Sequence, residues 1–426
     1  MASIPINIKY PKFMLLKNDL KEIKEKEIKL IVKGQGIFLF ENTINDKECI
    51  FTLYDKNKVN GLQVKFTKYE VRVIELIGSK PLIDGDNKSG LLNNNGVYYW
   101  FSIDAQNQQL FAGYGEARVE NIIYHYYYDK NKTNKSFLES IISIDISKDY
   151  NNIHLLKLLR DPITSCLPLS VKDTDKLSML DIASGSFLPS SNLSSTAQKL
   201  YNCISGKNFV LDDNDFPDFS DAIEYNINTP GCWCYEKLLA KSSEFNPDKP
   251  NILETYLRIT LGQNNGESPG VPYVMEIWPP GHFSPIHNHA GANAIIRVLH
   301  GSINVSLYPF LCPEGIKPFG TYCFDKDDIT WISPTLNQTH QLYNSNDKNT
   351  CITIQCYMYE GDNDIHYDYF DYIDADGVKQ YYEPDSDLDF IQFKEIIKEE
   401  WEKSDNKIKK YSNKLSFSNL LYKFLN

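Results

Sequence analysis

The fragment from Gly281 to Gly301 constrains this chain more than any other part of the sequence. It follows a Pro-Pro dipeptide and carries His287 and His289 with a single residue between them. On a β-strand, alternate side chains point to the same face, so these two histidines can offer their imidazoles to one metal ion. Five of the eight histidines lie between residues 282 and 340. The fragment therefore predicts a β-structure that presents imidazoles on one face.

A third histidine extends this candidate ligand set. His340 follows a turn that begins at Pro334, and Asn344 comes four residues later. A His-x-His pair alone is a weak signal, because 8 histidines in 426 positions give about 0.15 such pairs by chance. Two surface histidines on an edge strand are the alternative. Neutral imidazoles are strong ligands for divalent first-row metals, and three of them leave coordination positions open. We therefore predict metal ligation by His287, His289 and His340.

Charge and targeting signals narrow the class of partner. Residues 1–150 carry 21 Lys and Arg against 19 Asp and Glu, whereas residues 151–426 carry 23 against 37. An acidic chain lacks the basic footprint that phosphate binding needs, so we expect no nucleic-acid partner. The chain has neither an 18-residue apolar run nor a signal-peptide core, so we expect no membrane contact and a cytoplasmic location. Its nine scattered cysteines, without a CxxC pair, predict buried free thiols.

Hydrophobic patterns predict four segments. Residues 1–150 alternate apolar strand-like segments with polar loops, which predicts a β-rich module of unknown role. Residues 151–200 are rich in Leu, Ser and Pro and predict a linker that is partly helical, and residues 137–160 also look partly helical. Short helices are expected over 196–203 and 232–243, and residues 201–385 contain a second β-rich stretch from Tyr256 to about Tyr382. Residues 386–426 predict an amphipathic helical tail, from the helical spacing of Phe390, Phe393, Ile397 and Trp401.

The histidine spacing resembles the cupin superfamily. Its first motif reads G-x5-H-x-H-x(3,4)-E-x6-G, and its second ends in H-x3-N. Every Gly and His of the first motif is present, and Ala294 stands where the Glu ligand is usual. Three histidines without a carboxylate are similar to the ligand set of the thiol dioxygenases, cysteine dioxygenase in particular. The resemblance covers residues 205–385 and implies a cupin β-barrel that holds Fe(2+). Without the Glu ligand the metal is more positive, which favours an anionic sulfur donor.

Two more segments carry this resemblance. Family members hold the substrate carboxylate with the Arg of a Tyr-x-Arg segment, which implies this role for Arg258 in Tyr256-Leu257-Arg258. A planar guanidinium binds a carboxylate with two parallel hydrogen bonds. The alternative is a structural ion pair with Glu254, one turn away if the segment is helical.

The second segment is a Ser-x-His-x-Tyr strand whose Tyr hydroxyl points at the iron. It corresponds to Thr353, Gln355 and Tyr357, and Gln355 departs from the family because an amide cannot titrate near neutral pH. Animal cysteine dioxygenases carry a Cys cross-linked to that Tyr at the position of Ala294, so Tyr357 is expected to stay a free phenol. Residues 366–371 resemble the closing hairpin of the family.

The predicted fold is therefore mainly β, with an N-terminal β-sandwich-like domain, a C-terminal cupin β-barrel with flanking short helices, and a C-terminal helix. The resemblance implies an enzyme that oxidises L-cysteine with dioxygen to cysteine sulfinate, in cysteine catabolism and taurine biosynthesis. Its partners would be a small thiol and dioxygen. The alternatives are another small thiol, such as mercaptopropionate or cysteamine, and a non-catalytic metal-binding cupin that acts as a ligand-binding or sensor protein.

The N-terminal module carries a weaker pattern. Residues 96–121 resemble the β-sandwich domain named after farnesoic acid O-methyltransferase, a likeness that extends over about residues 60–150. Gly113-Tyr114-Gly115 lacks the third Gly and the helix of a dinucleotide-binding loop. Tyr98, Tyr99 and Trp100 favour core and edge positions of a sandwich over a platform for a sugar or peptide. An unidentified ligand or protein partner of this module stays open.

Overall fold

A computed structural model describes the chain in two compact units, Met1–Cys166 and Leu167–Asn426. The described residues are 13–15, 27–42, 48–76, 80–82, 97–128, 135–146, 153–163, 166–262, 272–311, 317–359 and 370–404. Most of the expected closing hairpin (366–369) and the end of the expected tail (405–426) lie outside them. Among the described residues, no helix is long and apolar enough to cross a bilayer. The eight cysteines described are free thiols.

The first unit consists of two six-stranded antiparallel sheets. Their strand orders are β1-β12-β3-β8-β9-β10 and β2-β11-β4-β5-β6-β7. The elements are β1 (Phe13–Leu15), β2 (Glu27–Lys29), β3 (Gln35–Asn42), β4 (Cys49–Asp55), β5 (Gly61–Phe66), β6 (Val71–Glu75), β7 (Lys80–Leu82), β8 (Tyr98–Asp104), β9 (Gln109–Tyr114), the 3-10 turn η2 (Val119–Asn121), β10 (Ile122–Tyr127), α1 (Lys135–Leu138), β11 (Ile141–Ile146) and β12 (Ile153–Leu159).

Aromatic rings from both sheets form the core of this unit. Phe40 on β3 lies 4.5 Å from Phe51 on β4 and 4.9 Å from Phe66 on β5, measured between ring centroids. Alternation along each strand directs these rings inward, as a sandwich requires. The predicted mainly β fold with an N-terminal sandwich is thus confirmed.

Two details of the first unit bear on the sequence-based expectations. Trp100 and Tyr99 are buried in the core, whereas Tyr98 is 39% exposed. A Cβ added to Gly113 would lie 2.2 Å from the Trp100 ring, so the glycine makes room for that ring rather than for a phosphate. The expectation that residues 137–160 are partly helical is wrong beyond α1, because the Ile- and Leu-rich runs there form β11 and β12. β-branched residues favour strands wherever they can pair and pack.

The second unit is a barrel of two six-stranded sheets. The strand orders are β21-β18-β23-β16-β15-β26 and β20-β19-β22-β17-β24-β25, and neighbours pair antiparallel except for β15 with β26. The strands are β13 (Val171–Lys172), β14 (Leu188–Pro189), β15 (Leu257–Leu261), β16 (Tyr273–Trp278), β17 (Ile286–His287), β18 (Asn293–His300), β19 (Ser302–Tyr308), β20 (Gly320–Asp325), β21 (Ile329–Ile332), β22 (Thr339–Tyr343), β23 (Cys351–Met358), β24 (Phe370–Ile373), β25 (Lys379–Tyr382) and β26 (Leu388–Asp389). Two facing sheets with this alternating order form the double-sheet barrel of the cupin fold.

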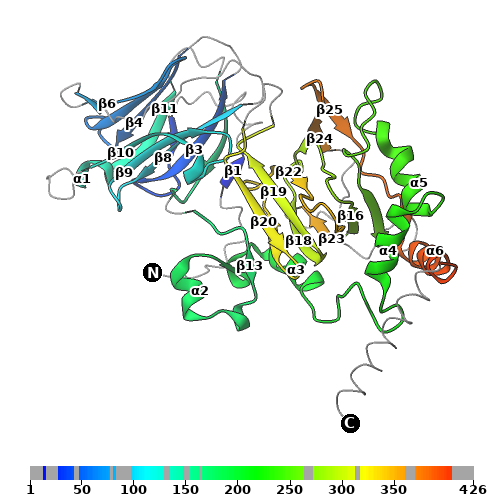
Figure 1. The fold of residues 1–426 in the computed structure, drawn as a ribbon. Helices are drawn as coiled ribbons and strands as arrows, with labels where there is room; N and C mark the ends of the chain where they lie inside the picture. Colours follow the sequence, from blue (N-terminus) through cyan, green and yellow to red (C-terminus); the bar gives the residue numbers. More distant parts are fainter. Residues whose placement is uncertain are drawn as a thin grey trace. The chain divides into compact units, whose positions relative to one another are not determined.

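Short helices flank this barrel. They are η4 (Thr174–Lys176), α2 (Met179–Ser184), η5 (Ser190–Asn192), α3 (Ser195–Ile204), α4 (Phe219–Asn228), α5 (Trp233–Ala240), η6 (Lys241–Ser243) and α6 (Phe390–Glu402). α3 packs on β18 and β23, while α4, α5 and α6 lie together beside β15 (Figure 1). The predicted C-terminal helix is confirmed: Asp389 caps α6, and Phe393, Ile397 and Trp401 form its buried face.

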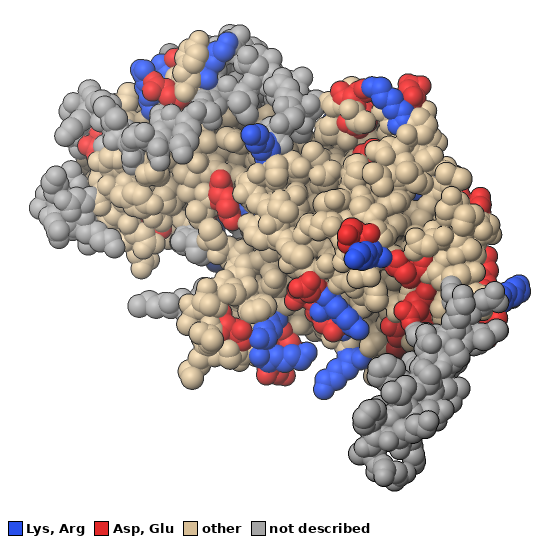
Figure 2. All heavy atoms as spheres, viewed as in Figure 1, with Lys and Arg blue, Asp and Glu red and all other residues tan. Residues whose placement is uncertain are grey.

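The expected segment 151–200 is divided between the units, since β12 pairs with β3 in the first unit and α3 packs on the barrel of the second. On the face in Figure 2, the described Lys and Arg side chains are interspersed with Asp and Glu rather than gathered in one basic patch.

Candidate metal centre

The barrel brings the three predicted histidines together. His287 on β17 pairs directly with His340 on β22, and His289 follows two residues after His287. The ring centroids lie 4.7 to 5.0 Å apart, and all three candidate ligand atoms fall within 4.8 Å of one another. Nε2 of His289 is 3.0 Å from Nε2 of His340. Two nitrogens about 2.1 Å from one metal ion, at right angles, are about 3.0 Å apart. The geometry therefore fits a shared metal ion.

The three imidazoles are neutral near pH 7, as metal ligands must be. Burial lowers the pKa of His287 to about 4, and the charge of Arg258 adds to the effect. Burial also lowers the pKa values of His289 and His340 well below the ordinary value, and neighbouring histidines add to the effect there. His287 donates its Nδ1–H to the Pro285 carbonyl at 3.0 Å, which leaves Nε2 free to ligate. His289 is fixed by packing instead, since its ring stacks on Tyr357 and lies 4.9 Å from Phe370.

Loop contacts hold the histidine-bearing segments in place. The Asn344 side chain donates to the carbonyls of Trp278 and Asn349, and its backbone pairs with Gly281 and His282. The last residue of the second motif therefore secures the turn that opens the first. Gly301 has a φ of +69°, and a Cβ there would lie 2.6 Å from the Thr350 carbonyl oxygen, so the glycine is required.

Gln338 joins the turn after His289 to the segment before His340. Its side chain accepts from the Gly291 N–H at 2.8 Å and donates to the Ala292 carbonyl at 2.9 Å. The turn is tight, with positive φ at Ala290 and Gly291. Gln338 thus ties together the two segments that carry the ligands.

A cavity beside the histidines contains most of the other predicted site residues. Its lining includes Arg258, Gln355 and Tyr357 together with the three histidines. The other lining residues are Tyr256, Glu276, Trp278, Leu342 and Phe370. Of these, the sequence had pointed only to Tyr256, as the first residue of the Tyr-x-Arg segment. Thr353 is not among them: it is fully buried and accepts from the Trp278 indole N–H at 3.4 Å. The predicted place of Thr353 in the site stays a prediction, since the hydrogen bond of its side chain is to Trp278.

Arg258 has a partner that the sequence analysis did not name. It lies on β15 directly opposite Glu276 on β16, and its Nη1 donates to Glu276 Oε1 at 2.6 Å. Both side chains are buried, at 6% and 5% exposure. The alternative pairing with Glu254 required a helix that would place the two residues one turn apart, whereas Arg258 lies on a strand. Helical spacing therefore does not apply, and Glu276 is the ion-pair partner.

Burial and charge act in opposite directions on this pair. Burial lowers the pKa of the Arg258 guanidinium. The negative charge of Glu276 raises the pKa by more than burial lowers it, so the net shift is upward. Burial raises the pKa of the Glu276 carboxyl, and Arg258 opposes that shift. The net shift of the Glu276 pKa is still upward, so Arg258 offsets the effect of burial only in part.

Tyr357 is held by its neighbour two residues away. Its hydroxyl donates to Gln355 Oε1 at 2.6 Å, and both side chains are buried on the same face of β23. Burial raises the pKa of Tyr357 well above its ordinary value, so the phenol keeps its proton. Ala294 lies directly opposite Tyr357 across the sheet, so the residue at the usual Glu position offers no ligand atom.

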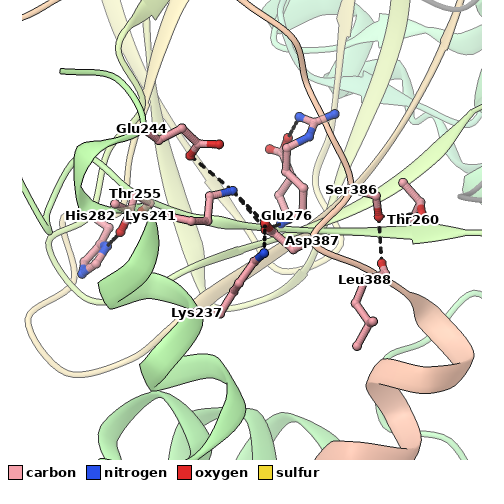
Figure 3. Close-up of polar contacts among 11 residues, drawn as sticks. Lys237, Lys241, Glu244, Thr255, Thr260, Glu276, His282, Ser386, Asp387 and Leu388 are labelled. Carbon is pink, nitrogen blue, oxygen red and sulfur yellow. Dashed lines mark hydrogen bonds and ion pairs between the residues drawn. The ribbon is translucent and has the colours of Figure 1, made fainter. Parts of the chain in front are cut away.

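An ionic cluster centred on the buried Asp387 and Lys241 secures the strand that carries Arg258. Figure 3 shows Lys237 and Lys241 converging on Asp387, with Glu244 beside Lys241. Asp387 also accepts from the backbone N–H of Arg258 at 2.7 Å and donates its own N–H to the Arg258 carbonyl at 2.8 Å. The segment leading into α6 is thereby attached at the position of Arg258.

Glu276 had a signal in the sequence that could have been found. It is the one charged residue in the apolar strand β16. A lone charge inside an apolar strand needs a partner, and the strand opposite contains Arg258. What the sequence lacked was the register that places the two side by side.

Comparisons with known proteins cover about a quarter of the chain. No family model matches the chain. Solved structures that resemble it include the cupin domain of Cnp3 from Schizosaccharomyces pombe, at 14% identity and a TM-score of 0.20 over 25% of this chain and 65% of that one. The cupin domain of an XRE family transcriptional regulator from Enterobacter cloacae matches at 15% identity and 0.20, over 25% and 98%.

Oxalate oxidase in complex with the substrate analogue glycolate matches at 17% identity and a TM-score of 0.20, over 26% of this chain and 52% of that one. The matched part spans about half to two thirds of the oxalate oxidase and Cnp3 chains. At this level of likeness no activity, substrate or partner follows from these proteins. The cupin-type barrel and its three clustered histidines rest on the strand order and distances given above.

Proposed function

We propose that the second unit is an iron(II)-dependent thiol dioxygenase that oxidises L-cysteine to cysteine sulfinate. The reaction adds both atoms of dioxygen to sulfur, RS⁻ + O2 → RSO2⁻, so it needs no external reductant. The observation that carries the proposal is the cluster of three neutral histidines with Ala294 in place of a carboxylate ligand. With neutral ligands only, a divalent ion keeps its full charge and attracts a thiolate.

His287, His289 and His340 would hold the metal, and iron(II) bound there would supply the activation of dioxygen and a binding position for sulfur. The chain's own residues do the rest. Arg258 offers donors for a substrate carboxylate, and the Tyr357 hydroxyl, fixed by Gln355, provides an oriented polar group beside the histidines. Tyr256 and Trp278 stack at 4.2 Å between ring centroids and form an apolar part of the lining. Such an enclosure limits the substrate to a small thiol.

The test has two parts on the purified full-length chain. Metal analysis should find about one iron per chain, falling below a tenth of that in His287→Ala and in His340→Ala. His300→Ala is the matched control, because His300 ends β18 and is not among the clustered histidines. Full iron retention in both ligand variants would contradict the metal site.

The second part measures dioxygen uptake and sulfinate formation with L-cysteine, mercaptopropionate and cysteamine. Thiol-dependent dioxygen uptake with sulfinate as product supports the proposed dioxygenase activity. The thiol with the highest kcat/KM identifies the preferred substrate. Bound iron without uptake from any thiol would instead favour a non-catalytic metal-binding cupin that acts as a ligand-binding or sensor protein.

A further inference from the structure

One wall of the cavity is an aromatic ring that lies against the metal centre. The ring centroid of Phe370 is 4.9 Å from that of His289 and 6.4 Å from those of His287 and Tyr357. The Phe370 side chain is buried, at 4% exposure, and lines the cavity. Phe370 therefore brings an apolar surface directly beside two of the three candidate ligand rings.

Strand pairing sets the position of this ring. β17 pairs with β24 at His287, and the Asn288 N–H donates to the Asp371 carbonyl at 2.9 Å. One residue further along this antiparallel ladder, Phe370 comes opposite His289. On its other side, β24 pairs with β25. The aromatic wall is thus attached through the backbone to the segment that carries His287 and His289.

The cavity has little space beside this ring. Its volume is about 270 Å³, below the range of about 300–1,000 Å³ that is typical of sites for larger ligands. The stacked rings of Tyr256 and Trp278, together with Leu342, form further apolar walls. Packed interiors contain few voids, so a ligand group that overlaps a wall finds no free space next to it. The bulk of each wall therefore limits the bulk of the ligand.

We propose that Phe370 is a specificity-determining residue, whose bulk limits the substituents that a thiol can carry next to its sulfur. This inference rests on the proposed thiol dioxygenase function and deepens it. A substrate whose sulfur reaches the metal brings the neighbouring carbon close to the histidines, where the Phe370 ring takes up space. That carbon is a CH2 group in L-cysteine, whereas it carries two methyl groups in L-penicillamine. The two thiols have the same charged groups, so they differ in bulk alone.

The experiment measures the binding of L-cysteine and L-penicillamine to the iron-loaded full chain by anaerobic calorimetry. The Kd of L-penicillamine in wild type should exceed that of L-cysteine by at least about 10-fold, since one extra methylene in an apolar pocket changes discrimination about 10- to 200-fold. In Phe370→Ala this Kd ratio should fall about 10-fold, because the space of the ring becomes open to the methyl groups. Phe370→Leu keeps part of the bulk, so its ratio should fall between those of wild type and Phe370→Ala.

Iron content separates this role from a structural one. It should stay at about one iron per chain in both variants, because Phe370 is not among the clustered histidines. Phe324→Ala is the matched control: Phe324 is also buried, at 2% exposure, but it belongs to the barrel core and does not line the cavity. Its Kd ratio should equal that of wild type. If Phe370→Ala loses iron and binds both thiols equally more weakly, Phe370 only supports His289 and the inference is overturned.

The remaining outcomes also decide the inference. If Phe370→Ala fails to fold, Phe370→Leu takes its place, and an unchanged Kd ratio in that variant refutes the inference. Equal binding of the two thiols to wild type refutes it as well. Oxidation of L-cysteine with unchanged Kd ratios in both Phe370 variants overturns the inference alone. If iron-loaded wild type neither binds nor oxidises a thiol, the proposed function fails and the inference falls with it.

Discussion

Replacing Asp387 by Asn should destabilise the second unit through a charge effect that can be measured. The Asp387 carboxylate lies 3.0 Å from Lys241 and 3.4 Å from Lys237, and it accepts the backbone N–H of Arg258. Asn has nearly the same shape and can still accept that N–H. The substitution therefore removes the negative charge while keeping the hydrogen bond that attaches the segment to β15.

The expected size follows from burial. Lys241 is 8% exposed and Asp387 6%, and removing one partner of a buried ion pair typically costs about 3–5 kcal/mol. Glu244 stays 3.3 Å from Lys241 and keeps part of the compensation. We therefore expect the free energy of unfolding to fall by about 2 kcal/mol. With a urea m-value of about 2 kcal/mol/M, the unfolding midpoint moves by about 1 M.

Tryptophan fluorescence can follow this transition in urea, because four of the five tryptophans lie in the second unit. Asp213→Asn is the matched control. The Asp213 carboxylate also accepts hydrogen bonds from a lysine ammonium and from backbone N–H groups, but its side chain is 40% exposed. An exposed pair contributes less than about 1 kcal/mol, so the control midpoint should barely move. Adding Lys241→Met to Asp387→Asn should restore part of the loss, because the buried ammonium that lost its carboxylate is removed, while Glu244 in turn loses Lys241. Equal shifts for Asp387→Asn and Asp213→Asn would refute the charge argument.

Three other outcomes follow from the structure. Below pH 6.5 the unfolded chain binds a proton at His287, whereas the folded pKa is about 4. Metal-free wild type should therefore lose more stability between pH 6.5 and 4 than His287→Ala does, measured by urea midpoints; parallel losses would contradict this. Gly301→Ala should cost several kcal/mol and Gly185→Ala only about 1, since both have positive φ but open space surrounds Gly185; similar melting temperatures would show that the Thr350 contact is relieved. Intact-mass analysis after turnover should show no loss of two hydrogens at Tyr357, and such a loss would reveal a cross-link.

The ligand cluster could be predicted from sequence because its signals are short. His287 and His289 are two residues apart, and strand alternation alone turns them to one face. The amphipathic face of α6 could also be predicted from the sequence, since Phe393, Ile397 and Trp401 recur at helical spacing and form its buried side. In both cases the relevant geometry is set by the local backbone.

The alternatives that depended on an assumed local conformation did less well. The pairing of Arg258 with Glu254 assumed a helix, but Arg258 lies on strand β15, where helical spacing does not apply. Thr353 shares a face of β23 with Tyr357, yet it bonds with Trp278 instead. Sharing a face places side chains on one surface but does not decide which neighbour from another strand lies against each.

By itself, the sequence determined the mainly β architecture, the C-terminal helix, and a set of imidazoles that could meet on one face. Tertiary structure alone decided that Arg258 lies beside Glu276 and that Asp387 attaches the segment before α6 to β15. The physical reason is how far apart in the sequence the interacting residues lie. Periodicity is encoded in contiguous residues, whereas strand register pairs residues that are 18 and 129 positions apart, and it emerges only when the whole sheet packs against its core.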